Sequence, residues 1–425
     1  MTAIAAPASA AKPSVDLRNY ALVTGAYWAD TLTDGALRML VLLYFHERGY
    51  SAVQVAMLFL LYEVFGVVTN LVGGWVAARL GLKATLFAGL GTQLAALAML
   101  AANPAWLTVP YVMAAQALSG IAKDLTKMSS KSAVKLIVAE DAHSALFKWV
   151  AILTGSKNAL KGVGFFAGGL LLYLVGFRAS VLILAALVAA ALVTAAALMR
   201  GDLGTANQKA KFRQMFSNNR GVNLLAAARV FLFASRDVWF VVGLPVFLYT
   251  VLGWNFWQVG GFMAAWVIGY GAVQAGAPGI LRRFYRDPAS APDGATATWL
   301  AFALAALPAS IAVALSSGFH PAAVVVTGLL VFGVVFALNS AVHSYLILAY
   351  TDNDKVAMNV GFYYTANACG RLGGTVLSGL LYQHFGLVGC LWASAGITLA
   401  AGLISLLLPS NRNARVPLAA AGGDG

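Results

Sequence analysis

Long runs of apolar residues, separated by short polar segments, make up most of this 425-residue chain. A helix needs about 20 apolar residues to cross a bilayer, and the runs are generally of that length or longer. The pattern therefore predicts an all-α integral membrane protein with twelve transmembrane helices. We place these helices at about 20–45, 53–77, 84–103, 106–127, 146–175, 178–199, 222–250, 256–280, 296–316, 321–346, 356–382 and 386–408.

The composition and the distribution of charge support this class. The chain is 60% hydrophobic and 10% charged, whereas a soluble domain usually carries about 25% charged residues. Most of the 28 Lys and Arg residues fall on one side of the predicted membrane, and only Arg48 and Arg178 fall on the other. By the positive-inside rule both termini are cytoplasmic. The formal net charge of +13 then reflects topology, and no nucleic-acid partner is expected.

A short sequence recurs at the same place in each half of the chain. Residues 49–55 read GYSAVQV and residues 253–259 read GWNFWQV, each at the turn into a predicted helix. Parallel repeats of this kind are found in major facilitator transporters. The repeat predicts that fold, with these parts: a cytoplasmic tail 1–19, a six-helix half 20–199, a cytoplasmic loop 200–221, a second six-helix half 222–408 and a cytoplasmic tail 409–425.

Two short motifs resemble elements of the same superfamily. The segment GWVAARLGLK (74–83) is similar to its cytoplasmic loop motif G-x-x-x-D-R-x-G-x-K, with matches at Gly74, Arg79, Gly81 and Lys83. Ala78 replaces the acid, so the resemblance implies a weaker or different latch between the halves. The segment GFFAGG (164–169) is similar to the antiporter element G-P-x-x-G-G. An ordinary basic loop and close helix packing explain the two motifs as well.

Charged residues occur at membrane depth, where even lenient scales assign a lone charge a cost of about 3 kcal/mol. Six are basic and four are acidic, which leaves a surplus of two positive charges. None falls on the third, sixth, ninth or twelfth predicted helix, as expected if those helices face lipid. The surplus predicts a polar cavity and an anionic substrate. The ten residues are Arg38, Lys157, Lys161, Arg229, Arg236, Arg371, Asp30, Asp34, Glu63 and Asp237.

The helical rise of about 1.5 Å per residue places several of these cations at a similar depth. Arginine suits phosphate or carboxylate through its planar fork, and lysine supplies a point charge. Lys123 is the deepest member of a lysine ladder after the fourth helix. Polar residues beside Arg371 could bind substrate or join helices by hydrogen bonds. The predicted substrate-binding residues are Arg38, Lys123, Lys157, Lys161, Arg236, Arg371, Tyr364 and Asn367.

The four acids are candidates for charge pairs or for proton coupling. Asp34 lies one turn from Arg38 and is its predicted partner, and Asp237 adjoins Arg236. Asp30 and Glu63 have no evident cation in their own helices. They are therefore the better candidates for proton uptake in an antiport cycle, with hydrogen bonding to neighbouring helices as the alternative.

Six stretches resemble the organoarsenical efflux permeases of bacterial arsenic-resistance operons. The resemblance implies efflux of 1-arseno-3-phosphoglycerate across the bacterial inner (cytoplasmic) membrane, and so arsenate resistance. It also implies that glyceraldehyde-3-phosphate dehydrogenase supplies this substrate by using arsenate in place of phosphate. The stretches are TGAYWADTLTDGALRMLVLLYFHERGY (24–50), LYEVFGVVTNLVGGW (61–75), AAQALSGIAKDLTKMSSKSAVKL (114–136), LTGSKNALKGVGFFAGG (153–169), ASRDVWFVVGLPVFL (234–248) and WQVGGFMAAWVIGYG (257–271).

The same membrane-depth charges are compatible with other functions. A transporter of another phosphate ester or organic anion would use the same cations, whereas a multidrug exporter is expected to show acids without a basic surplus. Cys369 and Cys390 are too few and too far apart in the sequence for a three-thiolate arsenite site. With no nucleophile, metal-ligand cluster or phosphate-binding loop sequence, the chain is not expected to be an enzyme or to hold a cofactor or metal. A monomer is expected.

Overall fold

The computed structural model describes residues 17–133, 143–200, 219–283, 292–350 and 356–409. Within these ranges the regular elements are all helices, which confirms the all-α class. The bounds are α1 Leu17–Glu47, α2 Ala52–Leu58, α3 Leu60–Leu80, α4 Leu82–Leu100, a short 3₁₀ turn Pro104–Trp106, α5 Val109–Ala133, α6 His143–Leu198, α7 Arg220–Phe240, α8 Gly243–Thr250, α9 Phe256–Arg282, α10 Gly294–Ser316, α11 Pro321–Ala349 and α12 Val356–Ser405.

Eight stretches of the described chain are long and apolar enough to cross a membrane. Two of them, Ser156–Leu198 and Phe362–Ser405, exceed 40 residues and contain a bend. The eight stretches leave out α1 and α5, which carry the polar residues of the cavity described below. The chain is therefore a multi-pass membrane protein.

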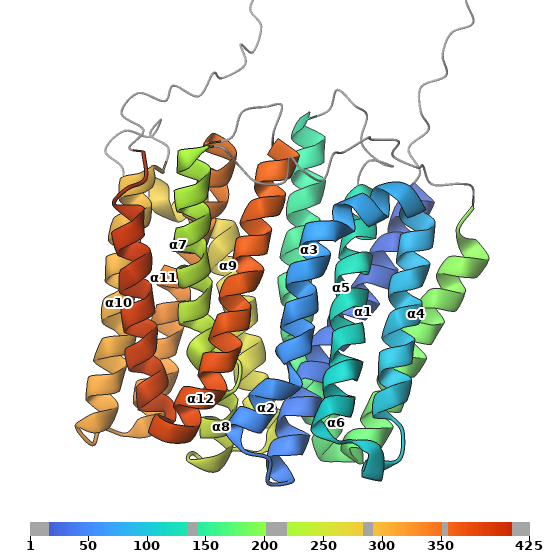
Figure 1. The fold of residues 1–425 in the computed structure, drawn as a ribbon, viewed down its shortest axis with the longest axis horizontal. Helices are drawn as coiled ribbons and strands as arrows, with labels where there is room; N and C mark the ends of the chain where they lie inside the picture. Colours follow the sequence, from blue (N-terminus) through green and yellow to red (C-terminus); the bar gives the residue numbers. More distant parts are fainter. Residues whose placement is uncertain (1–16, 134–142, 201–218, 284–291, 351–355, 410–425) are drawn as a thin grey trace, which may run out of the picture.

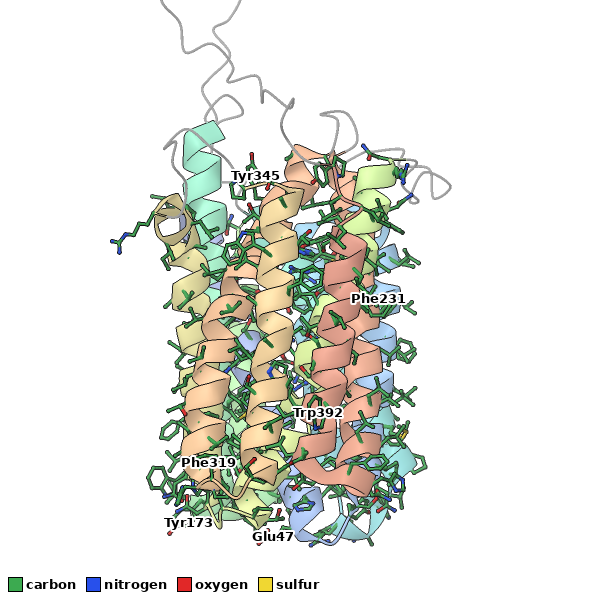
Figure 2. The ribbon with its side chains drawn as sticks, turned by 90° about the vertical axis from the view of Figure 1, so that its left-hand side faces the viewer. Glu47, Tyr173, Phe231, Phe319, Tyr345 and Trp392 are labelled. Atoms are coloured by element: carbon green, nitrogen blue, oxygen red, sulfur yellow. The ribbon has the colours of Figure 1, made fainter. Side chains whose placement is uncertain are left out.

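The helices form two bundles side by side, α1–α6 and α7–α12 (Figure 1). Across their boundary α6 packs against α9, and α12 packs against α2 and α3. Figure 2 shows Glu47, Tyr173 and Phe319 at one end of the molecule and Tyr345 at the other. We refer to these as the Glu47 end and the Tyr345 end.

Two of the longest helices reverse direction at a glycine. α6 turns at Gly176 (φ 76°) and α12 at Gly386 (φ 62°), a backbone region that side chains with a Cβ rarely adopt. Each helix therefore consists of two arms, and each arm corresponds to one predicted helix. The arms are 143–175 and 177–198 in α6, and 356–385 and 387–405 in α12.

The repeated heptapeptide has the same local structure in both bundles. Gly49 and Gly253 each adopt a positive φ, 86° and 68°. Ser51 then caps α2 and Asn255 caps α9, and each makes a reciprocal capping box with the glutamine three residues later. The repeat is thus a turn-and-cap unit that starts the helix after the Glu47 end in each bundle.

Two predicted helices are interrupted, which the apolar pattern did not reveal. The 53–77 segment breaks at Phe59 between α2 and α3, and the 222–250 segment breaks between α7 and α8. At the second break the Ser378 hydroxyl accepts hydrogen bonds from the amides of Val242 and Gly243, at 3.2 and 3.1 Å. A side chain of α12 therefore satisfies amides that the break leaves without helical partners.

The glycines of the GFFAGG segment bring helices into close contact. Gly164 and Gly168 lie against the α1 backbone at Leu32 and Ala36, and Gly169 lies against Phe256 of α9. A Cβ at Gly168 would overlap the Ala36 backbone. Small residues allow this approach, since dispersion and close packing drive helix association in lipid.

Replacing Gly168 with Ala should therefore destabilise the protein, because neither backbone can yield without separating α1 from α6. We expect a cost of about 1–3 kcal/mol, as for other overpacked sites, seen as a lower midpoint of thermal unfolding in detergent. Gly373→Ala is the matched control, since a Cβ there meets no atom within 4 Å. Equal midpoints for the two variants would contradict this account of the helix contact.

Candidate substrate-binding cavity

A cavity of about 270 Å³ lies between the two bundles. Its lining comes from α1, α3, α5, α7, α9, α11 and the first arms of α6 and α12. No described residue of α4, α10 or the second arms of α6 and α12 lines it. The third, sixth, ninth and twelfth predicted helices, which the charge pattern assigned to the lipid-facing side, thus contribute no described residue to the lining. Its basic lining residues are Arg38, Lys123, Lys127, Lys157, Lys161, Arg229, Arg236 and Arg371.

The structure brings every predicted substrate-binding residue to this one cavity. The six predicted cations line it together with Tyr364 and Asn367 of α12. Of the predicted acids, Asp34 and Asp237 also line it, whereas Asp30 and Glu63 are buried outside the lining. Whether these residues bind substrate remains a prediction.

Glu63 connects the two bundles through two arginines. Arg38 of α1 and Arg371 of α12 each direct Nη2 to the same carboxylate oxygen, Glu63 Oε1, at 2.8 and 2.7 Å. Glu63 is 1% exposed, so these charges meet in a largely dehydrated setting. The prediction that Asp34 is the partner of Arg38 is therefore wrong, and Glu63 does not lack a cation.

Asp34 is held by a tyrosine instead. The Tyr62 hydroxyl donates to Asp34 Oδ1 at 2.5 Å, and Lys123 Nζ donates to the Tyr62 oxygen at 2.9 Å. The Lys123 ammonium also lies 4.0 Å from the centre of the Tyr62 ring. One aromatic side chain of α3 thus links the α1 carboxylate to the α5 lysine.

Asp237 forms the predicted pair with its neighbour. Arg236 Nε and Nη2 approach Asp237 Oδ1 at 2.6 and 2.5 Å, and Arg371 Nε lies 3.8 Å from Oδ2. The Arg236 guanidinium also lies over the rings of Phe233 and Phe240. The Arg236 charge is thus compensated by the predicted carboxylate of Asp237 and, in addition, by two aromatic rings that the sequence did not indicate.

A further buried carboxylate, Asp124, was missed from the sequence. It is 1% exposed, pairs with Lys127 at 3.1 Å and accepts a hydrogen bond from Thr69 at 2.6 Å. Lys127 also donates to Asn70 at 2.8 Å. The three-residue spacing of Asp124 and Lys127 is compatible with an ion pair on one helix face. The lysine ladder around them, however, suggested a segment at the membrane surface rather than a buried carboxylate.

Asp30 has the least compensated carboxylate among the described residues. It is 1% exposed; its Oδ2 lies 2.5 Å from Thr126 Oγ1, and its Oδ1 has no hydrogen-bond partner. Thr126 Oγ1 also lies 3.0 Å from the carbonyl oxygen of Lys123. Because a hydroxyl has one hydrogen, Thr126 divides its donor between Asp30 and the Lys123 carbonyl, and Asp30 receives at most one hydrogen bond from the described residues.

The loop motif makes its described side-chain contacts, both through Lys83, within the first bundle, and one of them places Lys83 over the Phe87 ring. Gly81 has φ 78° and caps α4, and Lys83 Nζ donates to the carbonyl of Met199 at 3.3 Å. Gly74 and Arg79 lie on α3, but their side chains fall outside the described residues. Among those described, no motif side chain contacts the second bundle.

Eight cavity-lining cations exceed the five carboxylates buried in or behind the lining. Helices that span a membrane and surround a central polar cavity define a membrane transporter, and excess positive charge favours anions there.

The Major Facilitator Superfamily model matches residues 23–347, and the chain belongs to this superfamily of transporters. It is therefore a transporter and not an enzyme. No sequence among the curated proteins matches the chain.

Solved structures with a similar fold include three transporter structures, all at low sequence identity. A POT family transporter in complex with 5-aminolevulinic acid has a TM-score of 0.71 at 14% identity, covering 92% of this chain and 95% of that one. A POT family transporter with a thioalcohol-conjugated peptide has a TM-score of 0.71 at 13% identity, covering 93% and 97%. A mutant of the peptide transporter POT with sulfate has a TM-score of 0.68 at 14% identity, covering 91% and 93%.

Glu63→Gln should destabilise the protein, because it leaves Arg38 and Arg371 without their shared carboxylate. Breaking a buried ion pair costs about 3–5 kcal/mol, and the 21% exposure of the Arg371 side chain favours the lower end. Thermal unfolding in detergent measures the loss, and millimolar methylphosphonate should restore part of it. The exposed Glu47→Gln is the control, and an unchanged midpoint for Glu63→Gln would refute the role of this contact.

Proposed function

We propose that this protein exports a small, multiply charged anion from the cytoplasm, and that the anion is 1-arseno-3-phosphoglycerate. The observation that carries the proposal is the cationic surplus of the cavity. The substrate inferred from the resemblance bears two oxyanion groups and would be supplied by glyceraldehyde-3-phosphate dehydrogenase. Since one chain encloses a whole cavity, a monomer in the bacterial inner membrane would suffice.

The proposed topology has twelve spans in two six-helix halves. The eight apolar stretches supply ten spans when the two bent ones count twice, and α1 and α5 supply the others. Described basic residues gather at the Tyr345 end, among them Lys83, Arg200 and Arg220 at helix ends. By the positive-inside rule we assign this end, and both termini, to the cytoplasm.

Contacts between the bundles support a cavity loaded from the cytoplasm. Near the Glu47 end, Gln383 of α12 accepts a hydrogen bond from the Val53 amide at 3.2 Å, and His46 contacts the ring of Tyr249. In the other direction the lining extends to Ser344, next to Tyr345. Rocking of one bundle against the other around this site would expose it to each side in turn.

A bound anion would compete with Glu63 for Arg38 and Arg371. Arg371 belongs to the second bundle, whereas Arg38 and Glu63 belong to the first. An oxyanion that replaces Glu63 at Arg371 therefore alters an attraction between the bundles as well as filling the site. This gives the substrate a direct means of favouring one arrangement of the bundles over another.

Other substrates of the superfamily fit this cavity less well. The similar POT structures hold an amino acid and a peptide conjugate, and an amino group needs an available carboxylate. Here Asp34, Asp124 and Asp237 already accept hydrogen bonds or ion pairs. A cationic drug would also need an available carboxylate. Another phosphate ester or organic anion would fit the cavity, and transport assays distinguish such a substrate from the arseno-ester.

Lys161→Gln should abolish arsenate resistance and uptake of the arseno-ester into everted vesicles. Lys161 lines the cavity over the Phe165 ring, and no described carboxylate lies within ion-pair distance of it. Its charge is therefore available to the substrate. Vesicles would receive arsenate, glyceraldehyde-3-phosphate, NAD and the dehydrogenase.

Arg283→Gln is the matched control, since Arg283 is exposed at the end of α9 and does not line the cavity. It should transport as the wild type does. Uptake that is independent of the dehydrogenase would contradict the assigned substrate. Full activity in a well-expressed Lys161→Gln variant would contradict the assigned site.

If export is coupled to protons, Asp30 is the residue we expect to carry them. Glu63 is held by two guanidinium groups, whereas the described part of the chain gives Asp30 one hydrogen bond, from Thr126, and no ion pair. Coupling is not compulsory, because an inside-negative potential already favours anion export by about 2.3 kcal/mol per charge per 100 mV. With the potential clamped, collapsing the pH gradient should slow wild-type vesicles and leave Asp30→Asn unaffected. If wild-type transport does not change when the pH gradient is collapsed, the protein is a uniporter.

A further inference from the structure

Arg229 is a buried cation that has so far contributed only its charge to the cavity. It lies on α7, is 4% exposed and lines the cavity. Its guanidinium stacks on the rings of Phe233 and Tyr363, at 4.0 and 4.9 Å from their centres. Among the described residues no carboxylate lies within ion-pair distance of it. A buried charge without a counter-charge is costly unless a ligand supplies one.

Hydrogen-bond donors converge beside Arg229 in excess of the acceptor they share. Arg229 Nη1, the Tyr270 hydroxyl and Gln274 Nε2 all point to Ser340 Oγ, at 3.1, 3.2 and 3.4 Å, and Arg229 Nη1 also donates to the Ser340 carbonyl oxygen at 3.3 Å. A serine oxygen has two acceptor lone pairs, so it cannot satisfy all three donors fully. Arg229 Nε has no partner at all within the described structure. The arrangement resembles a donor cluster that lacks its anion.

These donors lie apart from the arginines around Glu63. Arg229 precedes Arg236 by seven residues on α7, which is two turns on the same face and about 10 Å along the axis. Arg371 lies at the level of Asp237, the neighbour of Arg236. The Arg229 cluster is therefore nearer the Tyr345 end, and both groups line the same cavity.

From this geometry we infer that Arg229, Tyr270 and Gln274 form a second oxyanion subsite, distinct from the one around Arg38 and Arg371. The ligand class is a two-headed anion, with a phosphate-like group at each end of a short chain. One head lies against Arg371 and the other replaces Ser340 as the acceptor of the three donors. The inference rests on the proposed anion transport and deepens it by adding the second subsite.

The test compares a one-headed probe, methylphosphonate, with a two-headed probe, propane-1,3-diphosphonate. Binding to the purified full-length protein is measured by calorimetry. Wild type should bind the diphosphonate at least about tenfold more tightly, because the second head binds at high effective concentration. Arg229→Gln should lose that advantage while keeping its methylphosphonate affinity, which also shows that the variant is folded.

Two further variants sharpen the result. Arg229→Lys should recover only part of the advantage, since an ammonium cannot reproduce the planar fork. Arg220→Gln changes an exposed arginine on the same helix and should behave as wild type.

The possible failures are distinguishable. If wild type binds neither probe, the proposed anion transport is overturned, and this inference with it. If wild type binds both probes equally, or if Arg229→Gln weakens both by the same factor, only the second subsite is overturned.

Discussion

The pairing of Arg38 and Arg371 with the single carboxylate of Glu63 is the interaction on which this structure depends. Three charged groups lie where a lone charge is costly, so each is retained only because the others are there. The group keeps a net positive charge after pairing. This group of three residues therefore joins the two bundles and still attracts an anion. The same contact stabilises the fold and contributes to the proposed substrate binding.

The rest of the cavity follows the same constraint. Asp237 is matched by Arg236 and Asp124 by Lys127, while Asp34 is held through the Tyr62 hydroxyl. Lys161 and Arg229, for which the described residues show no ion pair, line the cavity. The positive surplus is thus concentrated in one enclosed volume, where low polarity of the surroundings strengthens its field.

Close backbone contacts make the bundle arrangement possible. Gly169 lies against Phe256 where α6 meets α9, and Gly379 of α12 lies against Ala52 and Ala56 of α2. These contacts lie toward the Glu47 end, whereas the cavity extends toward the Tyr345 end. Gly162 also lies against Ala264 and Ile268 of α9 beside the cavity, so small residues let the bundles approach closely along α6 and α9.

The sequence alone determined the all-α class, the positions of the repeated turns and most of the charged residues at the cavity, although it missed Asp124, because these features follow from patterns along one helix. Apolar runs reveal helices since a bilayer requires every backbone group to bond internally. Only the tertiary structure decided which charges pair. Spacing favoured Asp34 for Arg38, but Tyr62 holds Asp34, and Glu63 on α3 reaches two arginines from different helices. The breaks at Phe59 and Val242 were equally invisible, and at Val242 a side chain of another helix compensates the break.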